Sequence, residues 1–290
     1  MAVITSIVFF GSGPVAAASL GFLSKNFNVE MVITKAVPTH HKEIAPVEQL
    51  ANKLRLPIIF ANTKQELDDI IDNHKFQSRL GILVDYGVIV SSKAIDCFEK
   101  GIVNSHFSLL PEWRGADPIT FSILSGQPKT GVSLMLIEPS LDTGKLLTRK
   151  SINIKSDDTS ISLTGRLVGL SNQLLCEYIP RYMSGDIKPK NQPHPDRATY
   201  SRKLTKADGL IDWGKSAEQI EREIRAYYEW PRSHTTVNDK LIIVTKAHVS
   251  DKRENQLDIL CGNSNYLSID ELIAPSGRTM TAKDFINGYL

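Results

Sequence analysis

Short apolar runs alternate with helix-spaced stretches over the first 140 residues of the chain. Residues 4–10 form a β-rich run that ends at Gly11, and an alanine-rich helical stretch follows to about Leu23. Similar runs recur at 29–34, 57–60, 81–84, 102–104 and 132–137, and helical segments recur at 46–54, 94–98 and 118–124. Strands that alternate with helices predict an α/β fold with a Rossmann-like, mostly parallel sheet and helices on both faces.

A long helix and a proline-rich stretch follow. Leucines with helical spacing mark one face of a helix that continues to about residue 182: Leu163, Leu167, Leu170 and Leu174. Residues 186–200 combine three prolines with scattered polar residues, which is typical of an extended linker. We therefore expect a first domain over residues 1–185, a linker over 186–200 and a second domain over 201–290.

The second domain is predicted to be a small β-barrel-like, OB-like unit. Its first element is a helix, which Ser216 could cap, with Gln219 three residues later completing a capping box. Strand-like runs follow at 241–245, 257–260 and 266–269. Several short strands after one helix are typical of a small barrel.

Composition narrows the class of protein only slightly. The 290 residues are 41% hydrophobic and 23% charged, which is ordinary for a globular protein of two domains. Three widely spaced cysteines (Cys97, Cys176 and Cys261) form no CxxC pair, so we expect reduced thiols and no metal site. The chain has no signal-peptide pattern and no apolar run of about 20 residues. We therefore expect a cytoplasmic protein with no membrane partner.

The first candidate motif lies in the turn after the first strand. Gly11-x-Gly13-x-x-Ala16 fits the dinucleotide fingerprint and keeps a nicotinamide-dependent oxidoreductase open as one hypothesis. That fingerprint also expects an acidic residue at the end of the second strand, where this chain has Thr34-Lys35. Pro14 removes one amide from the turn. A tight turn that allows close packing is the simpler interpretation.

The second candidate motif is more specific. Asn104 and His106 end a predicted strand and, two residues apart, share one of its faces. Ligands of open α/β sheets gather at such carboxyl ends. An imidazole can move a proton there, and an amide can donate to a developing oxyanion. Asp142, in a loop after another strand, is a candidate to orient the imidazole. These residue types together favour acyl-transfer chemistry.

Around these residues the chain resembles the folate-dependent formyltransferase family. The family pattern is Asn-x-His, Ser-Leu-Leu-Pro, an aromatic residue followed by Arg-Gly, and Leu-Asp-Thr-Gly. This chain carries it at 104–106, 108–111, 113–115 and 141–144. The resemblance covers essentially the whole chain, and the second domain favours the members that act on an aminoacyl-tRNA.

The resemblance implies the substrates and the roles of the site residues. The formyl donor would be 10-formyltetrahydrofolate, and the acceptor would be the α-amine of methionine on initiator tRNA, for translation initiation. Asn104, His106 and Asp142 would be catalytic, in a chain that acts as a monomer. The folate pocket would be lined by residues from three loops: Tyr86, Ser108, Leu109, Leu110, Pro111 and Ile137.

Several departures from the family pattern keep a second acceptor class open. Glu112 stands where the tRNA-directed members usually have Arg, and Asp117 replaces a usual Ala. The 35–44 loop is short and weakly basic, whereas in those members it is long and strongly basic. The alternative acceptor is therefore a nucleotide-linked amino sugar or another small amine.

Charge does not decide between these acceptors. Residues 201–290 hold 13 Lys or Arg and 13 Asp or Glu, so a phosphate-binding surface there would have to be a local patch. The best candidate for such a patch lies near the linker: Arg197, Arg202, Lys203 and Lys206.

Overall fold

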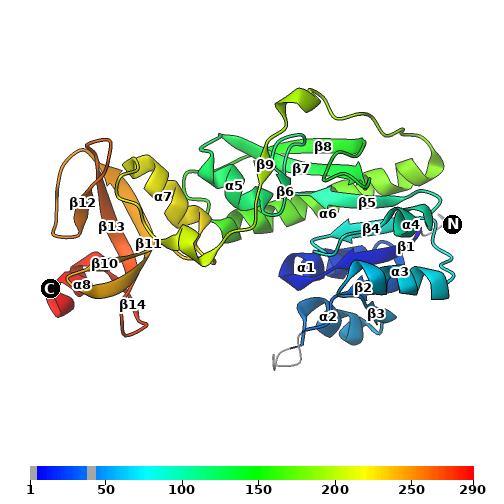
Figure 1. Ribbon diagram of the computed structural model, residues 1–290, viewed down its shortest axis with the longest axis horizontal. Coiled ribbons are helices and arrows are strands. Elements are labelled where there is room, and N and C mark those ends of the chain that lie inside the picture. The colour runs from blue at the N-terminus through cyan, green and yellow to red at the C-terminus, as the bar shows by residue number, and fades with distance from the viewer. Residues whose placement is uncertain (1–4, 38–43) are drawn as a thin grey trace. The chain divides into compact units, whose positions relative to one another are not determined.

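A computed structural model describes residues 5–37 and 44–290 (Figure 1). Two compact units emerge from its internal contacts. The first comprises Met1–Gly115, Gly131–Ser151 and Gly165–Tyr200, and the second comprises Ala116–Thr130, Ile152–Thr164 and Ser201–Leu290. The domain boundaries expected from the sequence stay a prediction. Most of the 35–44 loop (38–43) lies outside the described residues.

A seven-stranded sheet forms the centre of the α/β fold. Its order is β3-β2-β1-β4-β5-β7-β8. The strands are β1 (Ser6–Gly11), β2 (Asn28–Thr34), β3 (Ile58–Phe60), β4 (Gly81–Val84), β5 (Ile102–His106), β7 (Lys129–Leu136) and β8 (Leu146–Asn153). The pairs from β3 to β5 are parallel, and β5 pairs with β7 in the antiparallel direction. The prediction of a mostly parallel sheet is confirmed.

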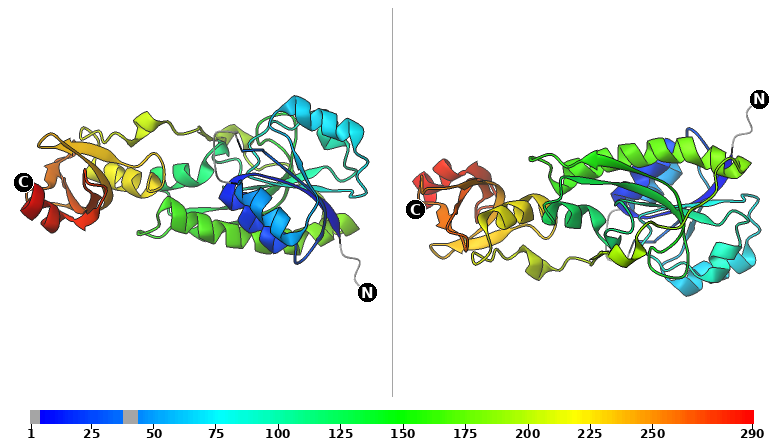
Figure 2. Two further views of the ribbon diagram at one scale, coloured as in Figure 1. Left: turned by 90° about the horizontal axis from the view of Figure 1, so that it is seen from below. Right: turned by 90° about the horizontal axis from the view of Figure 1, so that it is seen from above.

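Helices cover both faces of this sheet, as predicted. Helices α1 (Gly13–Leu23), α2 (Pro46–Leu54) and α6 (Ser160–Ser184) lie on one face, whereas α3 (Lys64–Asn73) and α4 (Ser92–Asp96) lie on the other (Figure 2). The core beneath α3 and α4 includes Val8, Phe10, Leu67, Leu83 and Tyr86. Within the part of the chain that the structure describes, no helix is both long and apolar enough to cross a membrane.

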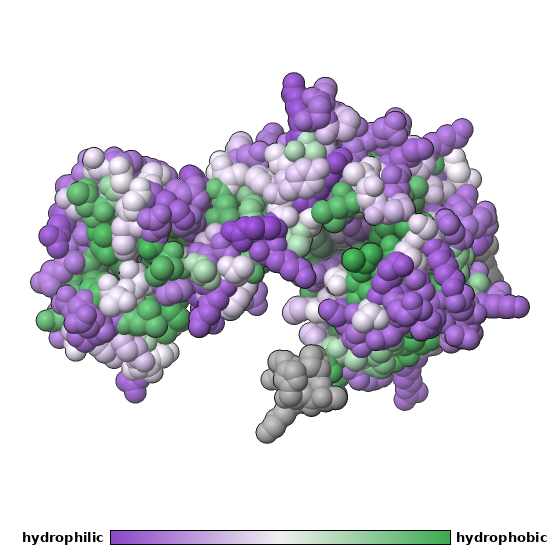
Figure 3. Space-filling view, in the orientation of Figure 1, coloured by the Kyte–Doolittle hydropathy of each residue, from purple (hydrophilic) through white to green (hydrophobic). Residues whose placement is uncertain are grey.

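The second unit is built on a curled antiparallel sheet. Its strands are β10 (His234–Val237), β11 (Lys240–Ser250), β12 (Asp258–Leu260), β13 (Tyr266–Ile273) and β14 (Thr279–Thr281). Helices α5 (Pro118–Leu124), α7 (Ala217–Ala226) and α8 (Ala282–Tyr289) belong to the same unit. The barrel-like prediction for this region is confirmed. Hydrophobic and hydrophilic patches alternate on the face of this unit that Figure 3 shows.

The start of α7 follows only half of the predicted pattern. The Ser216 hydroxyl accepts a hydrogen bond from the Gln219 amide at 3.2 Å, so the N-cap is present. The Gln219 side chain does not turn back to Ser216. It donates to Glu223 and accepts from Arg222, because both lie one turn along the same helix face. The predicted capping box is therefore wrong, although the cap itself is right.

Residues 186–200, which we call the strap, are irregular and hydrogen-bonded to the first unit. Lys190 and Leu146 exchange backbone hydrogen bonds of 2.7 and 2.8 Å. Near the end of the strap is the 3-10 helix η1 (Pro195–Arg197), and β9 (Tyr200–Ser201) pairs with the short strand β6 (Arg114–Gly115). A second 3-10 helix, η2 (Lys206–Gly209), follows in the second unit.

Candidate active site

Strand β5 places Asn104 and His106 on the sheet face that α3 and α4 cover. Ser105, between them, points to the other face, where its hydroxyl lies 2.6 Å from the Ser171 hydroxyl of α6. Side chains alternate along a strand, so Asn104 and His106 point away from α6. The Asn104 amide is half-buried, and none of the described residues forms a hydrogen bond with it. That amide is free to meet a ligand.

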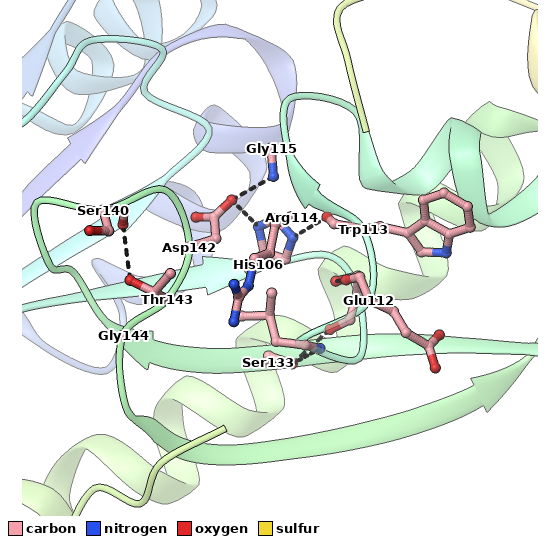
Figure 4. Close-up of polar contacts among 12 residues, drawn as sticks. His106, Glu112, Trp113, Arg114, Gly115, Ser133, Ser140, Asp142, Thr143 and Gly144 are labelled. Atoms are coloured by element: carbon pink, nitrogen blue, oxygen red, sulfur yellow. Dashed lines mark hydrogen bonds and ion pairs between the residues drawn. The ribbon is translucent and has the colours of Figure 1, made fainter. Parts of the chain in front are cut away.

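The His106 imidazole is buried, with 6% of its surface exposed, and is held between two partners (Figure 4). Its Nε2 lies 2.8 Å from the backbone carbonyl oxygen of Trp113. Its Nδ1 lies 3.7 Å from Asp142 Oδ2. A carbonyl oxygen only accepts, so Nε2 carries a proton and donates it to Trp113. The nitrogen that can gain or lose a proton is therefore Nδ1, which faces the carboxylate.

Asp142 is oriented by the backbone of its neighbours. Its Oδ2 accepts a hydrogen bond of 2.7 Å from the Gly115 amide, and its own backbone has a left-handed φ of 51°. Two residues later, a Cβ on Gly144 would lie 1.7 Å from the Leu136 carbonyl oxygen. Only glycine fits at that approach, so Gly144 lets the loop close over the end of β7.

A buried polar pair lies behind the Asp142 loop. Gln192 in the strap donates from Nε2 to the carbonyl oxygens of Asp142, at 2.7 Å, and Gly144, at 3.0 Å. Its Oε1 accepts a 2.7 Å hydrogen bond from the Arg114 guanidinium. Both side chains are 6% exposed. These contacts all lie within the first unit, so the strap, Arg114 and the loop form one network.

Trp113, the other partner of His106, has a strained backbone. Its φ is +55°, a conformation that bulky side chains rarely adopt. Its amide donates to the Thr199 hydroxyl at 2.9 Å, and the next amide, of Arg114, donates to the Thr199 carbonyl at 2.9 Å. The strap therefore holds the backbone that presents the Trp113 carbonyl to His106.

The predicted folate-lining residues 108–111 form a turn that is largely bonded within the protein. The Ser133 hydroxyl donates to the Ser108 carbonyl at 2.7 Å and accepts from the Leu110 amide at 3.0 Å. The carbonyl of Leu110 accepts from Arg149 at 2.9 Å. Ser108, Leu110 and Pro111 are buried, and Leu109 is half-buried. These hydrogen bonds give the turn a structural role, and its contact with folate stays a prediction.

The two other predicted folate residues differ in exposure. Tyr86 is 1% exposed, and its hydroxyl donates to the Ala61 carbonyl at 3.3 Å. Burial raises the pKa of its phenol, with the carboxylate of Glu66 adding to the rise. The Tyr86 side chain is therefore enclosed by the protein, and its contact with folate stays a prediction. Ile137 is half-buried and packs against the same core.

A surface cavity of about 390 Å³ lies between the loops that follow β4 and β7. Sequence reasoning did not single out its lining. Apolar side chains come from Ile89, Val90 and Pro139, and Ile89 is 75% exposed. Polar and charged side chains complete the lining: Lys64, Asp68, Ser91, Ser92 and Lys93. The volume is in the range of small-molecule sites.

The glycine-rich turn after β1 is occupied by another loop of the protein. The Ser12 amide donates to the Asp85 carbonyl at 2.9 Å, and the Ser12 hydroxyl donates to the Tyr86 carbonyl at 3.1 Å. A Cβ on Gly13 would lie 3.6 Å from the Asp85 carboxylate. Because the Ser12 amide is already hydrogen-bonded and the Asp85 carboxylate is nearby, this turn is poorly suited to bind a phosphate. The geometry favours the packing interpretation over a nicotinamide cofactor.

The structure brings His106 and Asp142 together, places Asn104 two residues before His106 on the same face of β5, and adds partners that the sequence did not reveal. Gly115, Gln192 and Thr199 carry no chemical signal of their own, since they act through an amide, a carboxamide and a hydroxyl in ordinary loop sequence. Over residues 5–37 and 44–290, no group of three or more His, Cys, Asp or Glu is placed to hold a metal ion.

The chain is similar to formyltransferases over nearly its whole length. The family model for formyl transferase matches residues 6–179, and the model for the formyl transferase C-terminal domain matches residues 203–290. A methionyl-tRNA formyltransferase from Methylococcus capsulatus is 35% identical over 84% of this chain and 82% of that protein. One from Myxococcus xanthus is 31% identical over 98% and 95%.

Solved structures share the fold at lower sequence identity. An N-formyltransferase from Helicobacter canadensis, in complex with folinic acid and dTDP-3-aminofucose, has a TM-score of 0.71 at 17% identity, over 92% of this chain and 99% of that chain. A phosphoribosylglycinamide formyltransferase from Bacillus halodurans has a TM-score of 0.54 at 22% identity, over 63% and 97%.

Proposed function

Because this chain belongs to the formyl transferase family, we propose that it transfers the formyl group of 10-formyltetrahydrofolate to the α-amine of methionine on initiator tRNA. The observation that carries the proposal is the buried His106 between Asp142 and the Trp113 carbonyl, beside the free amide of Asn104. The methionyl-tRNA formyltransferases that match both domains support this acceptor.

Asn104 and His106 divide the chemistry between an amide and an imidazole. Asn104 donates to the formyl oxygen, where negative charge develops as the amine attacks, and one such donor is worth about 3 kcal/mol. His106 receives the proton that the amine loses, at Nδ1, because Nε2 is committed to the Trp113 carbonyl. Asp142 orients the imidazole and helps return the proton to the departing nitrogen.

We propose that part of the folate occupies the cavity between the β4 and β7 loops, where Ile89 and Pro139 follow the predicted Tyr86 and Ile137 by three and two residues. Ile89, Val90 and Pro139 offer an apolar wall for a flat ring system. Lys64 and Lys93 also line the cavity, and each is paired with a carboxylate, Asp68 and Asp72 respectively. Pro139 belongs to the loop that carries Asp142, so a ligand in this cavity contacts the catalytic loop directly. Bound there, the folate supplies the activated formyl group.

Three further expectations follow from the proposed reaction. The site is assembled from one unit of one chain, which supports a monomer as the active species. An acceptor that takes part in translation initiation supports our expectation of a cytoplasmic protein. We also propose that residues 1–185 are the catalytic domain, that 186–200 connect the domains and that 201–290 form the second domain.

The proposal is tested by formyl transfer from 10-formyltetrahydrofolate to charged initiator methionyl-tRNA, with charged elongator methionyl-tRNA as the control. Transfer to the initiator alone is the expected result. A third reaction offers a nucleotide-linked amino sugar, the acceptor class that the short 35–44 loop leaves open. Transfer to the sugar and to neither tRNA would replace the proposed acceptor while retaining the donor.

A further inference from the structure

We infer that the strap, residues 186–200, is part of the active site, where Gln192 and Thr199 position the two partners of His106. The inference rests on the proposed function, since it concerns how the same His106 is held for catalysis. Gln192 fixes the Asp142 loop, and Thr199 fixes the Trp113 backbone. Neither side chain touches His106, so both are positioning residues.

The Gln192 carboxamide is buried, and both its nitrogen and its oxygen form hydrogen bonds. Its Nε2 donates two hydrogen bonds to carbonyl oxygens on either side of Thr143, which ties down the turn that bears the Asp142 carboxylate. Its Oε1 accepts from Arg114, one residue before the Gly115 amide that binds Asp142 Oδ2. One side chain therefore connects the backbone of Asp142 to the segment that holds its carboxylate.

Thr199 acts at the other nitrogen of the imidazole. Its hydroxyl accepts from the Trp113 amide, and its carbonyl accepts from the Arg114 amide, on either side of the Trp113 carbonyl that His106 contacts. Trp113 has a φ of +55°, a conformation that persists only when its surroundings hold it. Without the hydroxyl acceptor, we expect Trp113 to relax and its carbonyl to turn away from Nε2.

These contacts matter for turnover because the His106–Asp142 separation is already 3.7 Å. That distance is longer than a hydrogen bond and must shorten when the pair takes up a proton. Misplacement of a catalytic group by about 1 Å costs on the order of 100-fold in rate. A strap that limits how far Asp142 and Trp113 move therefore affects kcat more than substrate binding.

The experiment compares matched variants of the full chain. Gln192→Glu keeps the shape and an acceptor for Arg114 but cannot donate to the two carbonyls, and Gln192→Ala removes all three contacts. Thr199→Val keeps the shape without the hydroxyl, whereas Thr199→Ser retains it. Asn191→Ala, at the exposed neighbour of Gln192, is the control.

We expect kcat to fall about 10- to 100-fold in Gln192→Glu, Gln192→Ala and Thr199→Val, with KM values within about threefold of the wild type. Thr199→Ser and Asn191→Ala should keep normal rates.

A second measurement does not depend on the reaction. Residue-resolved hydrogen exchange of the free protein should show faster exchange of the Gly115 amide in both Gln192 variants, and of the Trp113 amide in Thr199→Val, by about tenfold or more. Amides of the central strands should be unchanged. Exchange that rises equally everywhere would show a merely structural role and overturn the inference, as would normal kcat in folded variants. A wild-type protein that transfers no formyl group would instead refute the proposed function, and the exchange result would still decide whether the strap holds the loop.

Discussion

His106 shows how backbone groups can set the protonation chemistry of a side chain. The carbonyl of Trp113 commits Nε2 to donate, and Asp142 lies beside Nδ1, so the exchangeable proton is confined to the side that faces the carboxylate. The second unit offers a contrast, because His248 Nδ1 lies only 2.9 Å from Asp270 Oδ1. That pair is exposed, with 53% and 33% of the two side chains accessible. Burial and a second partner distinguish the candidate catalytic pair.

The first prediction concerns turnover after removal of each catalytic group. His106→Ala and Asp142→Asn should each lower kcat by about 10²- to 10⁴-fold. The first variant removes the acceptor of the amine proton, and the second removes the carboxylate that orients this acceptor. Asn104→Ala should lower kcat about 10²- to 10³-fold, because the developing oxyanion loses a donor. Stopped-flow or quenched transfer assays on folded variants give these values. The control is His248→Ala, which should leave kcat unchanged.

The second prediction concerns the glycine that closes the Asp142 loop. A methyl group at Gly144 would overlap the Leu136 carbonyl oxygen, so Gly144→Ala must push the loop outward and carry Asp142 with it. We expect kcat to fall about 100-fold and the free energy of unfolding to fall by about 1–3 kcal/mol. Gly169→Ala is the matched control, since a Cβ there meets nothing within 4 Å inside α6 and should add stability of up to about 1 kcal/mol. Equal behaviour of the two variants would contradict the steric explanation.

At the residue scale the sequence identified chemistry and missed its supports. Asn104, His106 and Asp142 stand out because an amide, an imidazole and a carboxylate seldom gather at strand ends for packing alone. Gln192 could not be identified, because a carboxamide in a proline-rich stretch looks solvated until the fold buries it 50 residues from Asp142. Local sequence does not carry contacts of that separation.

At the scale of elements, the turn between β5 and α5 is organised by strand β7. Ser133 pairs with His106 in the sheet register, and its hydroxyl bonds both Ser108 and Leu110 in the turn. Arg149 of β8 adds a bond to the Leu110 carbonyl. The edge of the sheet thus holds the turn that leads from His106 towards Trp113.

The third prediction tests that attachment through the stability of the protein. Ser133→Ala leaves the buried Leu110 amide and Ser108 carbonyl without their partner, which should lower the free energy of unfolding by about 1–3 kcal/mol. Urea unfolding measures the change. Ser151→Ala, at an exposed position of β8, serves as the control and should lie within about 0.5 kcal/mol of the wild type. A Ser133→Ala variant as stable as the control would show that the turn does not need the hydrogen bonds of Ser133.

The elements themselves were predictable where their burial pattern was simple. Strands β1 and β4 are nearly continuous apolar runs because the parallel sheet buries both of their faces. Strand β2 follows this pattern only in its second half, after Glu30. Helix α3 was missed because five of its ten residues are charged, and only Leu67 is buried. Strand β8 was missed because exposed Arg149 and Lys150 interrupt its hydrophobic pattern. It is a strand because it pairs with β7, a contact that its own sequence does not reveal.

At the scale of the whole molecule, each of the two units has a core of its own. The first unit holds every residue of the candidate site. The second unit has a separate core that includes Ile220, Ile224, Leu267 and Phe285. Residues 201–290, which make up most of this unit, hold equal numbers of acidic and basic residues, and several of them form local charge pairs.

One such pair, Arg202 and Asp208, makes the stability of the second unit depend on pH in the acidic range. Arg202 forms two hydrogen bonds to the Asp208 carboxylate, which also accepts from the Thr205 amide at 2.6 Å and the Thr205 hydroxyl at 2.9 Å. The bonds from Arg202, followed by those from Thr205, hold the pKa of Asp208 well below its ordinary value. Because the unfolded chain takes up this proton near pH 4 and the folded chain only at lower pH, the stabilisation is complete above about pH 4. It is lost as the pH falls further.

The fourth prediction is therefore a difference between two pH values. Asp208→Asn should be less stable than the wild type by about 1 kcal/mol at pH 6, a modest figure because Arg202 is 59% exposed and solvent screens the pair. At pH 3 the gap should narrow, because the unfolded wild-type chain then binds a proton at Asp208 that the folded protein does not bind, which lowers the wild-type free energy of unfolding. Urea unfolding at both pH values measures the two gaps, and other carboxylates cancel because both proteins share them. A gap that stays constant or widens in acid would mean that Asp208 contributes through shape rather than through its charge.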